Sequence, residues 1–236
     1  MIDLYTWPTS NGHKVHIMLE ECGLEWAAHP VRIGFGEQFA PEFLAFSPNN
    51  KTPAMIDRDG PGGTEIRMFE SGAILIYLAE KTGRFLPGDP HQRYDVMQWL
   101  MFQMSTVGPM LGQTHFFHKY APDHFDRDGL TIGINRYVGE ANRIYNILDN
   151  RLGEAEWLAA GEYSIADMAV WPWLRAPDFQ GVEIDKYPNV QRWQAQIAER
   201  SAVQRALLVL EENNRSTPHN DDQWEIMFGS IQYQRR

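Results

Sequence analysis

The hydrophobic pattern of this chain changes at one proline- and glycine-rich segment, Pro87-Gly88-Asp89-Pro90. Before this segment, short alternating runs typical of strands are interleaved with runs of helical spacing, in the order β-α-β-α-β-β-α. After it, the apolar residues recur only at helical spacing. We therefore expect a mixed α/β domain followed by an all-α domain, joined by a linker at residues 84–90.

The first domain, residues 1–83, is expected to contain four short strands and three helices. The strands are expected at residues 2–6, 26–33, 54–57 and 65–69, and two of the helices at residues 41–46 and 71–82. We expect the remaining helix to be capped by Ser10 or Asn11 and to end at Gly23. Residues 34–38 contain two glycines and are expected to be a mobile loop. This order of elements is that of a thioredoxin-like domain.

The second domain, residues 91–211, is expected to be an α-helical bundle. Helical spacing is found near residues 91–118, 130–152, 164–175, 188–199 and 201–211. Residues 96–118 contain no Asp, Glu, Lys or Arg, which indicates a buried segment, but polar residues interrupt them too often for a membrane span. Ser164 and Asp167 form a capping-box pattern at the start of one helix. Residues 212–236 form a tail, whose aromatic half we expect to pack over a cleft or on a partner subunit.

The charge and cysteine content narrow the classes of partner and compartment. The net charge of −10 argues against nucleic acid as the main partner, because phosphate binding requires clustered Lys and Arg. Cys22 is the one cysteine, so the chain cannot form an internal disulfide and suits a reducing compartment. The first residues contain neither a basic region nor an apolar signal core, and we therefore expect a cytoplasmic protein without a membrane partner.

Two short stretches of the first domain indicate a peptide-shaped surface that binds carboxylates. Residues 49–56 predict a loop in which Pro53 opens a strand, and this indicates a special turn because proline donates no hydrogen bond to a sheet. Residues 69–75 predict a strand that runs directly into a helix, with Glu70 and Ser71 at the junction. The start of a helix presents unpaired N–H groups and the positive end of a dipole, and it therefore favours anions.

Four motifs, taken in order, resemble those of cytosolic glutathione transferases. They are Pro8-Thr9-Ser10-Asn11-Gly12-His13-Lys14, Ser47-Pro48-Asn49-Asn50-Lys51-Thr52-Pro53-Ala54, Phe69-Glu70-Ser71-Gly72-Ala73-Ile74 and Ser164-Ile165-Ala166-Asp167. The first two motifs, together with residues 108–113, are similar to the bacterial nu class of that family. The resemblance implies the glutathione transferase fold, a thioredoxin-like domain followed by an α-helical bundle, and it does not extend to the tail.

The resemblance implies a partner for each polar group of the γ-glutamyl and cysteinyl units of glutathione. Ser71 is assigned to the γ-glutamyl carboxylate and Glu70 to the γ-glutamyl amine. The backbone of Thr52, followed by a cis Pro53, is assigned to the cysteinyl unit. The alternative interpretations are a simple helix cap for Ser71 and an ordinary turn proline for Pro53.

The resemblance also implies residues for the remaining carboxylates of glutathione. Lys51 and Gln38 are assigned to the glycyl carboxylate, and Arg136 to a glutathione carboxylate, either in its own subunit or across a homodimer. The alternative interpretation of Lys51 and Arg136 is that both are ordinary surface cations.

The thiol of glutathione decides the chemistry, because the turn before the first helix contains no cysteine. Resemblance to the nu class implies that Thr9 and Asn11 lie nearest the sulfur as the catalytic residues, and Ser10 is the alternative at the serine position of other classes. A hydroxyl or amide donor beside a helix N-terminus favours thiolate over thiol. We expect Cys22, on the apolar face of its helix, to be an inert buried thiol.

The second substrate is expected to lie against the uncharged helical region. The side chains expected to line this cleft are Trp99, Phe102, Gln103, Phe116, Phe117 and Tyr120, although aromatic residues at helical spacing are more often part of a core. We expect no metal site, because His115, His118 and His124 have no companion ligands at suitable spacing.

The resemblance implies a homodimeric enzyme that uses glutathione, with one or two molecules per site, to reduce disulfide bonds. Conjugation of glutathione to electrophiles and reduction of peroxides are alternatives that use the same thiolate. A third alternative is a non-catalytic protein that binds glutathione and acts through interaction or regulation.

Overall fold

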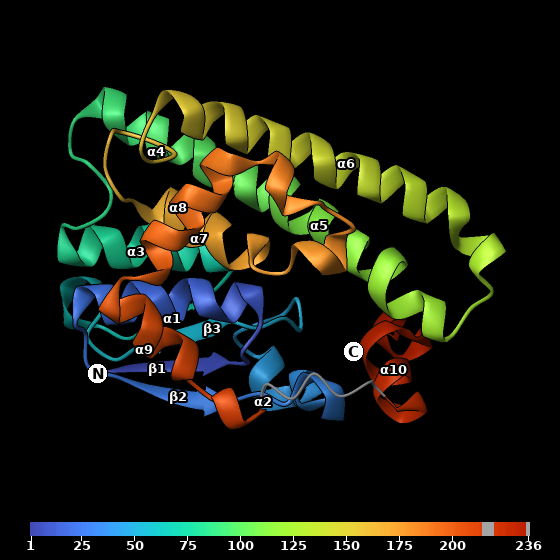
Figure 1. Cartoon of the computed structure of the whole chain (residues 1–236). Coiled ribbons are helices and arrows are strands. Elements are labelled where there is room, and N and C mark those ends of the chain that lie inside the picture. Colours follow the sequence, from blue (N-terminus) through green and yellow to red (C-terminus); the bar gives the residue numbers. More distant parts are fainter. Residues whose placement is uncertain (214–219, 235–236) are drawn as a thin grey trace. The chain divides into compact units, whose positions relative to one another are not determined.

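The computed structural model of the chain describes residues 1–213 and 220–234 (Figure 1). It divides into two compact units: the first contains residues 1–78 and the described part of 204–236, and the second contains residues 79–203. The first unit has a mixed α/β fold and the second is helical, which confirms the predicted fold class.

The first unit is built on a four-stranded sheet with the strand order β2-β1-β3-β4. β1 (Ile2–Thr6) pairs in parallel with β2 (Trp26–Pro30) and antiparallel with β3 (Ala54–Asp57), which pairs antiparallel with β4 (Ile66–Phe69). Three of the strands agree with the prediction to within one residue. The predicted second strand stops early, at Pro30, because the chain turns there into two short 3-10 helices.

Helices of the first unit cover the sheet and supply its core. α1 (Ser10–Cys22) connects the two parallel strands, which require a crossover of this kind. α1 and α3 (Ser71–Thr82) lie on the same face of the sheet (Figure 1). Their apolar side chains, such as Met18 and Leu75, are fully buried. α2 (Pro41–Leu44) is shorter than predicted.

Two local predictions for the first unit are wrong. The cap of α1 is neither Ser10 nor Asn11 but Thr9, whose backbone is extended and whose hydroxyl accepts a hydrogen bond from Gly12 N at 3.2 Å. The predicted mobile loop at residues 34–38 forms two 3-10 turns, η1 (Ile33–Phe35) and η2 (Glu37–Phe39), separated by a glycine in the left-handed region.

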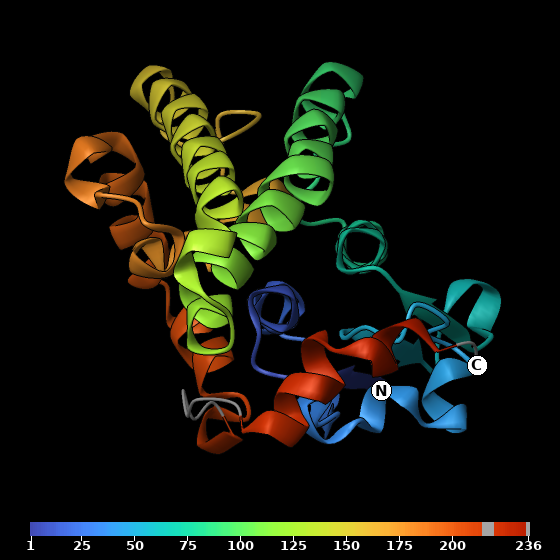
Figure 2. The same ribbon diagram turned by 90° about the vertical axis from the view of Figure 1, so that its right-hand side faces the viewer.

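The second unit contains two long antiparallel helical segments (Figure 2). The first segment runs through α4 (Pro90–Phe102), α5 (Gly108–Thr114) and two π-helical segments, η4 (Gln103–Val107) and η5 (His115–Tyr120). The second is α6 (Arg127–Glu154). The sequence predicted the first segment as one helix and did not predict its π-helical turns.

The remaining helices complete both units. They are α7 (Ile165–Leu174), α8 (Pro188–Ala198), α9 (Ser201–Leu208) and α10 (Asp221–Phe228). Short 3-10 turns are η3 (Pro61–Gly63), η6 (Ala121–Asp123), η7 (Pro177–Gln180), η8 (Ile184–Lys186), η9 (Glu211–Asn213) and η10 (Ser230–Tyr233). Among the described helices, none is both long enough and apolar enough to cross a membrane.

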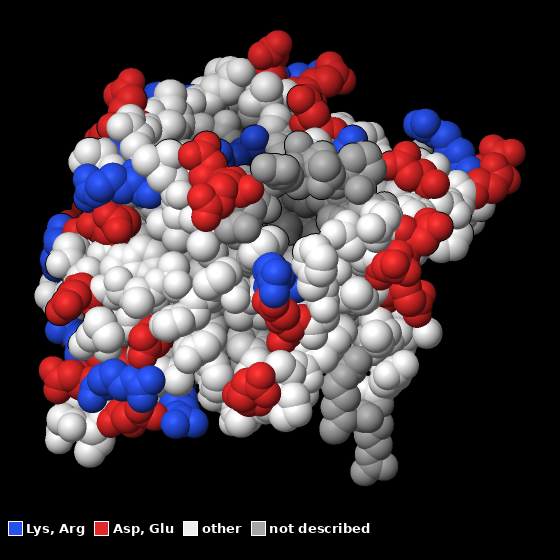
Figure 3. Space-filling model, turned by 90° about the horizontal axis from the view of Figure 1, so that it is seen from below, with Lys and Arg blue, Asp and Glu red and all other residues white. Residues whose placement is uncertain are grey.

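Charged side chains are spread over the surface. On the face drawn in Figure 3, acidic and basic groups are interspersed among uncharged atoms, and the described residues of that face form no continuous basic patch. This agrees with the net charge of −10.

His16 makes the stability of the first unit sensitive to acid. It is fully buried on α1, its Nε2 lies 2.9 Å from Thr6 Oγ1, and its ring stacks on Trp26. Burial, with a smaller effect of His13, lowers the pKa of His16 to about 3. As the pH falls below about 6.5, the unfolded chain gains a proton on this residue that the folded protein does not, so the free energy of unfolding decreases.

The contribution of His16 can be measured with a variant that does not titrate. Between pH 7 and pH 5, the free energy of unfolding of the wild type should fall by about 2 kcal/mol more than that of His16→Gln. Urea unfolding at the two pH values gives both differences. Equal decreases in the two proteins would contradict this account of His16.

Candidate functional site

The register of the sheet gathers three of the predicted motifs at one edge. Tyr5 of β1 pairs with Ala54 of β3, which in turn pairs with Phe69 of β4. The loop after β1, the turn before β3 and the residues after β4 therefore emerge side by side. The Thr9 motif, the Pro53 motif and the Glu70 motif belong to these three connections, so the first unit brings them together.

The start of α1 combines side-chain donors with a helix N-terminus. The Thr9 oxygen accepts from Gly12 N, so the hydroxyl hydrogen of Thr9 can donate to a ligand atom just beyond the helix start. Asn11 is half-buried in the first turn. A Cβ atom at Gly12 would lie 2.1 Å from the carbonyl oxygen of Trp7, so this tight return of the chain requires glycine.

The turn before β3 has the conformation that the resemblance implies. The peptide bond between Thr52 and Pro53 is cis, which confirms that prediction. Ser47 Oγ donates a hydrogen bond to the carbonyl oxygen of Lys51 at 2.9 Å and fixes the turn from the preceding loop. The backbone N–H and C=O of Thr52 are thereby held in a defined direction at the sheet edge.

The junction of β4 and α3 combines a carboxylate with a helix start. Glu70 is exposed and has a φ of 71°, an uncommon value for a residue that is not glycine. Its carbonyl oxygen accepts from Ile74 N at 3.0 Å, so the helix begins immediately after it. Ser71, the first residue of α3, is 5% exposed. An exposed acid and a helix-start hydroxyl therefore lie next to each other.

Lys14 is a residue of this site that the sequence interpretation missed. Its side chain is 1% exposed, and its Nζ donates to Ser71 Oγ at 3.3 Å. Burial lowers the pKa of Lys14 to about 7, while the charge of Glu70 opposes this shift. The available signal was its helical spacing, since Ile17 and Met18, three and four residues later, are both core residues.

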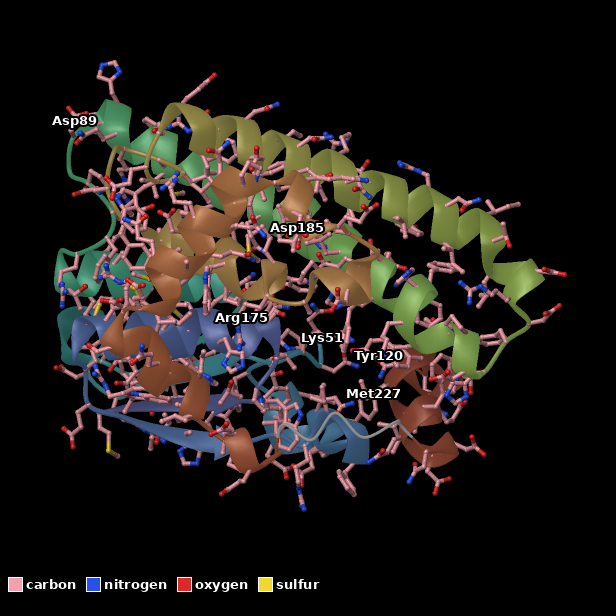
Figure 4. All side chains as sticks on the ribbon, viewed as in Figure 1. Lys51, Asp89, Tyr120, Arg175, Asp185 and Met227 are labelled. Atoms are coloured by element: carbon pink, nitrogen blue, oxygen red, sulfur yellow. The ribbon has the colours of Figure 1, made fainter. Side chains whose placement is uncertain are left out.

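Lys51 and Gln38 occupy different surroundings in the first unit. Desolvation lowers the pKa of Lys51, which lies in the loop before β3 (Figure 4). Gln38 is buried, and its amide donates to the carbonyl oxygen of Ile33 at 3.0 Å. One of its two amide N–H groups is thus used within its own turn, whereas a glycyl carboxylate requires a donor. The ammonium of Lys51 remains the better suited of the two groups to a carboxylate.

The C-terminal tail reaches the segment that carries Gln38. α10 packs against η1 in the first unit, and a methyl group added at Gly34 would lie 3.6 Å from Gln223 Nε2. Met227, labelled in Figure 4, is half-buried on this helix. α10, which contains Trp224 and Phe228, thus packs on the first unit of the same chain, whereas Tyr233 is exposed, and residues 214–219 and 235–236 of the predicted tail lie outside the described residues.

The residues predicted for the second-substrate cleft belong to the second unit. Trp99 and Phe102 pack edge to face with their ring centroids 5.7 Å apart. Tyr120 and Phe179 pack in the same way, with centroids 6.4 Å apart. Phe116 contacts the edge of Phe117 at 5.1 Å. Gln103 is fully buried, at the start of η4.

Phe117 and Arg136 have clear packing partners on α6. Phe117 stacks on Tyr137 at 5.3 Å and covers Gly133 so closely that a Cβ atom there would lie 2.4 Å from its ring. Arg136 is exposed and forms an ion pair with Glu140 at 3.4 Å, a carboxylate that Arg143 also binds, at 2.6 Å. Arg136 thus sits at the protein surface, where a ligand carboxylate would compete with Glu140.

The described histidines and Cys22 are not clustered as metal ligands. Among the described residues, no group of three His, Cys, Asp or Glu side chains is arranged to hold a metal ion. Cys22 ends α1 and is half-buried, so the prediction that it is buried holds only in part.

Comparison with known proteins connects this geometry to a family. Family models of the glutathione S-transferase N-terminal and C-terminal domains match residues 10–81 and 135–201. The chain is 46% identical over 209 residues to disulfide-bond oxidoreductase YfcG of Escherichia coli, which covers 88% of this chain and 95% of the relative. This chain belongs to the glutathione transferase family.

Two solved structures resemble this transferase along most of its length. A glutathione transferase from Pseudomonas putida, with one glutathione disulfide bound per subunit, has a TM-score of 0.83 and 47% identity, over 89% of this chain and 91% of that one. A family member from Pseudomonas fluorescens, with two glutathione molecules bound, has a TM-score of 0.82 and 47% identity, over 87% and 92% of the two chains.

Proposed function

We propose that this glutathione transferase reduces disulfide bonds with glutathione. The observation that carries the proposal is the row of three connections at one sheet edge, which brings donors for a thiolate close to groups suited to a peptide and its carboxylates, with no cysteine before α1. The identity to a disulfide-bond oxidoreductase and the bound glutathione disulfide and glutathione pair of the two Pseudomonas structures support it.

In the proposed binding mode, Glu70 pairs with the γ-glutamyl amine and Ser71 donates to the γ-glutamyl carboxylate. The backbone of Thr52, before Pro53, pairs with the cysteinyl unit, and Lys51 approaches the glycyl carboxylate, with Gln38 in the adjoining turn. Arg136 and the cleft residues Trp99, Phe102, Gln103, Phe116, Phe117 and Tyr120 are proposed to serve the second substrate or a second glutathione. We further propose a cytoplasmic homodimer.

The proposed reaction takes both of its sulfur nucleophiles from glutathione. Thr9 and Asn11 stabilise the thiolate of one glutathione, which attacks the substrate disulfide, forms a mixed disulfide and releases one substrate thiolate. A second glutathione thiolate attacks the glutathione sulfur of the mixed disulfide. Oxidised glutathione forms, and the other substrate thiolate leaves and takes up a proton. Lowering the thiol pKa toward neutrality raises the thiolate fraction at pH 7 by up to about two orders of magnitude.

Parallel assays of two reactions test the proposal. With glutathione in excess, the wild type should reduce 2-hydroxyethyl disulfide faster than it conjugates an aromatic electrophile. Thr9→Ala and Asn11→Ala should each lower kcat/KM for disulfide reduction by about tenfold to a hundredfold, because each loses one donor to the thiolate. Thr9→Ala also loses its helix cap, so its free energy of unfolding should fall by about 1 kcal/mol.

The same assays discriminate among the alternatives. Rapid conjugation without disulfide reduction would contradict the proposal in favour of a conjugating transferase. Tight binding of glutathione with no turnover in either assay would favour a non-catalytic binding protein.

A further inference from the structure

Lys14 is a buried cation that the proposed reaction leaves unused. It lies in the first turns of α1, and its side chain is 1% exposed. Burying an ammonium group costs several kcal/mol unless charged or polar partners compensate, so buried lysines often have a specific role. A methionine would fill the same volume without this cost. The partners of Lys14 therefore indicate why the site retains a charge there.

Two partners of the Lys14 side chain lie at the β4–α3 junction. Its Nζ donates a hydrogen bond to Ser71 Oγ at 3.3 Å, which connects the buried lysine to the hydroxyl assigned to the γ-glutamyl carboxylate. Glu70 is the charged group whose field acts on Lys14. Before any ligand binds, the site thus contains the Glu70 carboxylate, the Ser71 hydroxyl and a buried lysine amine that can take up a proton.

The charges of a γ-glutamyl group complement this arrangement. Its amine and carboxylate share one carbon atom, so both must be neutralised within a small volume. Once the amine pairs with Glu70, the carboxylate that binds Ser71 needs a cation of its own. The Lys14 side chain is the cation nearest at hand, because its Nζ is hydrogen-bonded to Ser71 Oγ.

We propose that Lys14 is the positioning cation of the γ-glutamyl subsite and that binding of the ligand carboxylate transfers a proton from solvent to its Nζ. This inference rests on the proposed function, because it requires glutathione to bind at Glu70 and Ser71. It adds a residue that selects for the α-carboxylate, and it couples binding to pH.

The proton uptake follows from the electrostatics of the empty site. Burial lowers the pKa of Lys14 to about 7, so a large fraction of the amine is neutral at pH 7.5. A carboxylate brought next to Ser71 favours the charged form and raises that pKa. Glu70 is part of the site with and without the ligand. It raises the pKa of Lys14 less when the ligand amine pairs with it. Each binding event at pH 7.5 should therefore take up about 0.7 of a proton.

Calorimetry with S-methylglutathione measures this uptake, since its alkylated sulfur cannot ionise. Titrations at pH 7.5 in phosphate and in Tris, whose ionisation enthalpies differ, give the number of protons bound. The wild type should take up about 0.7 of a proton. Lys14→Met should take up none and bind tenfold to a hundredfold more weakly. Lys14→Arg, whose charge is permanent, should retain most of the affinity and take up no proton.

A second ligand tests the assignment without any mutation. In 4-aminobutyryl-cysteinyl-glycine, S-methylated, the α-carboxylate is replaced by hydrogen while the amine is retained. This analogue should bind to the wild type without proton uptake, and Lys14→Met should weaken its binding less than it weakens that of S-methylglutathione. Loss of affinity for both ligands to the same extent would mean that Lys14 only supports the fold.

The outcomes separate this inference from the proposed function. Binding of S-methylglutathione to the wild type with no net proton uptake, or with unchanged affinity in Lys14→Met, would overturn the role of Lys14 and leave glutathione binding intact. No heat from the wild type at millimolar ligand would overturn both.

Discussion

Glu70→Gln should weaken the binding of glutathione about a hundredfold, because the amide leaves the ligand amine without its opposite charge. Glu70 is exposed, and its backbone carbonyl, which accepts from Ile74 N, is unchanged by the substitution. The free energy of unfolding should therefore stay within about 0.5 kcal/mol of the wild type. Calorimetric titration with S-methylglutathione measures the dissociation constant, and urea unfolding measures the stability.

Glu80→Gln is the matched control for Glu70→Gln. Glu80 is an exposed carboxylate in the last turns of α3, away from the helix start, and it pairs with Arg93. Its replacement removes the same charge from the protein and should leave the affinity for glutathione unchanged. If both variants bound equally well, or if Glu70→Gln bound as tightly as the wild type, Glu70 would not be the amine partner.

The second large effect concerns the stability of the helical unit. Asp167, in the first turn of α7, is fully buried and accepts hydrogen bonds from Leu158 N, from Ser164 N and Oγ, and from Trp193 Nε1, at 3.1, 3.0, 3.1 and 2.8 Å. Burial raises the pKa of Asp167 to about 6, and these donors oppose the shift. Asp167→Ala removes this carboxylate and leaves several buried N–H and O–H donors without their acceptor.

We expect Asp167→Ala to lower the free energy of unfolding by about 3–5 kcal/mol. Ser164→Ala, which removes the cap hydroxyl but keeps the carboxylate, should cost only about 1 kcal/mol. Trp193→Phe removes one donor from the same carboxylate and should lie between the two. Urea unfolding of the three variants gives this order, and a loss below 1 kcal/mol in Asp167→Ala would contradict it.

The sequence predicted the elements of the fold where one pattern dominated. The α3 helix begins and ends at the predicted residues, Ser71 and Thr82, because Glu70 and Ser71 mark its start and Gly83 follows its end. The capping box of Ser164 and Asp167 is confirmed, since its spacing has few other physical meanings. The cis peptide before Pro53 was implied by resemblance alone.

Other features depend on contacts that a sequence pattern does not encode. Three consecutive residues, Thr9, Ser10 and Asn11, are all good helix caps, and their preferences differ by too little to select one. The close approach of Gly12 to the Trp7 carbonyl selects Thr9. The first π-helical segment, η4, ends two residues before Pro109, which has no N–H group to continue a regular helix.

In the candidate site too, the sequence predicted residues that belong to a motif and missed one that depends on tertiary contacts. Motif spacing indicated Glu70, Ser71 and Pro53, which lie on neighbouring connections of one sheet edge. Lys14 was missed because lysines are rarely buried, so its position on the core side of α1 becomes evident only from its contact with Ser71.

In the proposed reaction, glutathione supplies every reacting sulfur on the enzyme's side. Cys22 is the one cysteine of the chain, and it ends α1, whose other end carries Thr9. At 1.5 Å per residue, the length of this helix separates the two ends by about 20 Å. The Cys22→Ala variant therefore contains no protein thiol while the proposed site is intact.

The most direct test is the glutathione-dependent reduction of 2-hydroxyethyl disulfide by Cys22→Ala. We predict that its kcat/KM will equal that of the wild type to within about twofold, a difference of less than 0.5 kcal/mol in the barrier. A folded Cys22→Ala variant that had lost the activity would show that the protein provides the nucleophile itself, and it would contradict the mechanism.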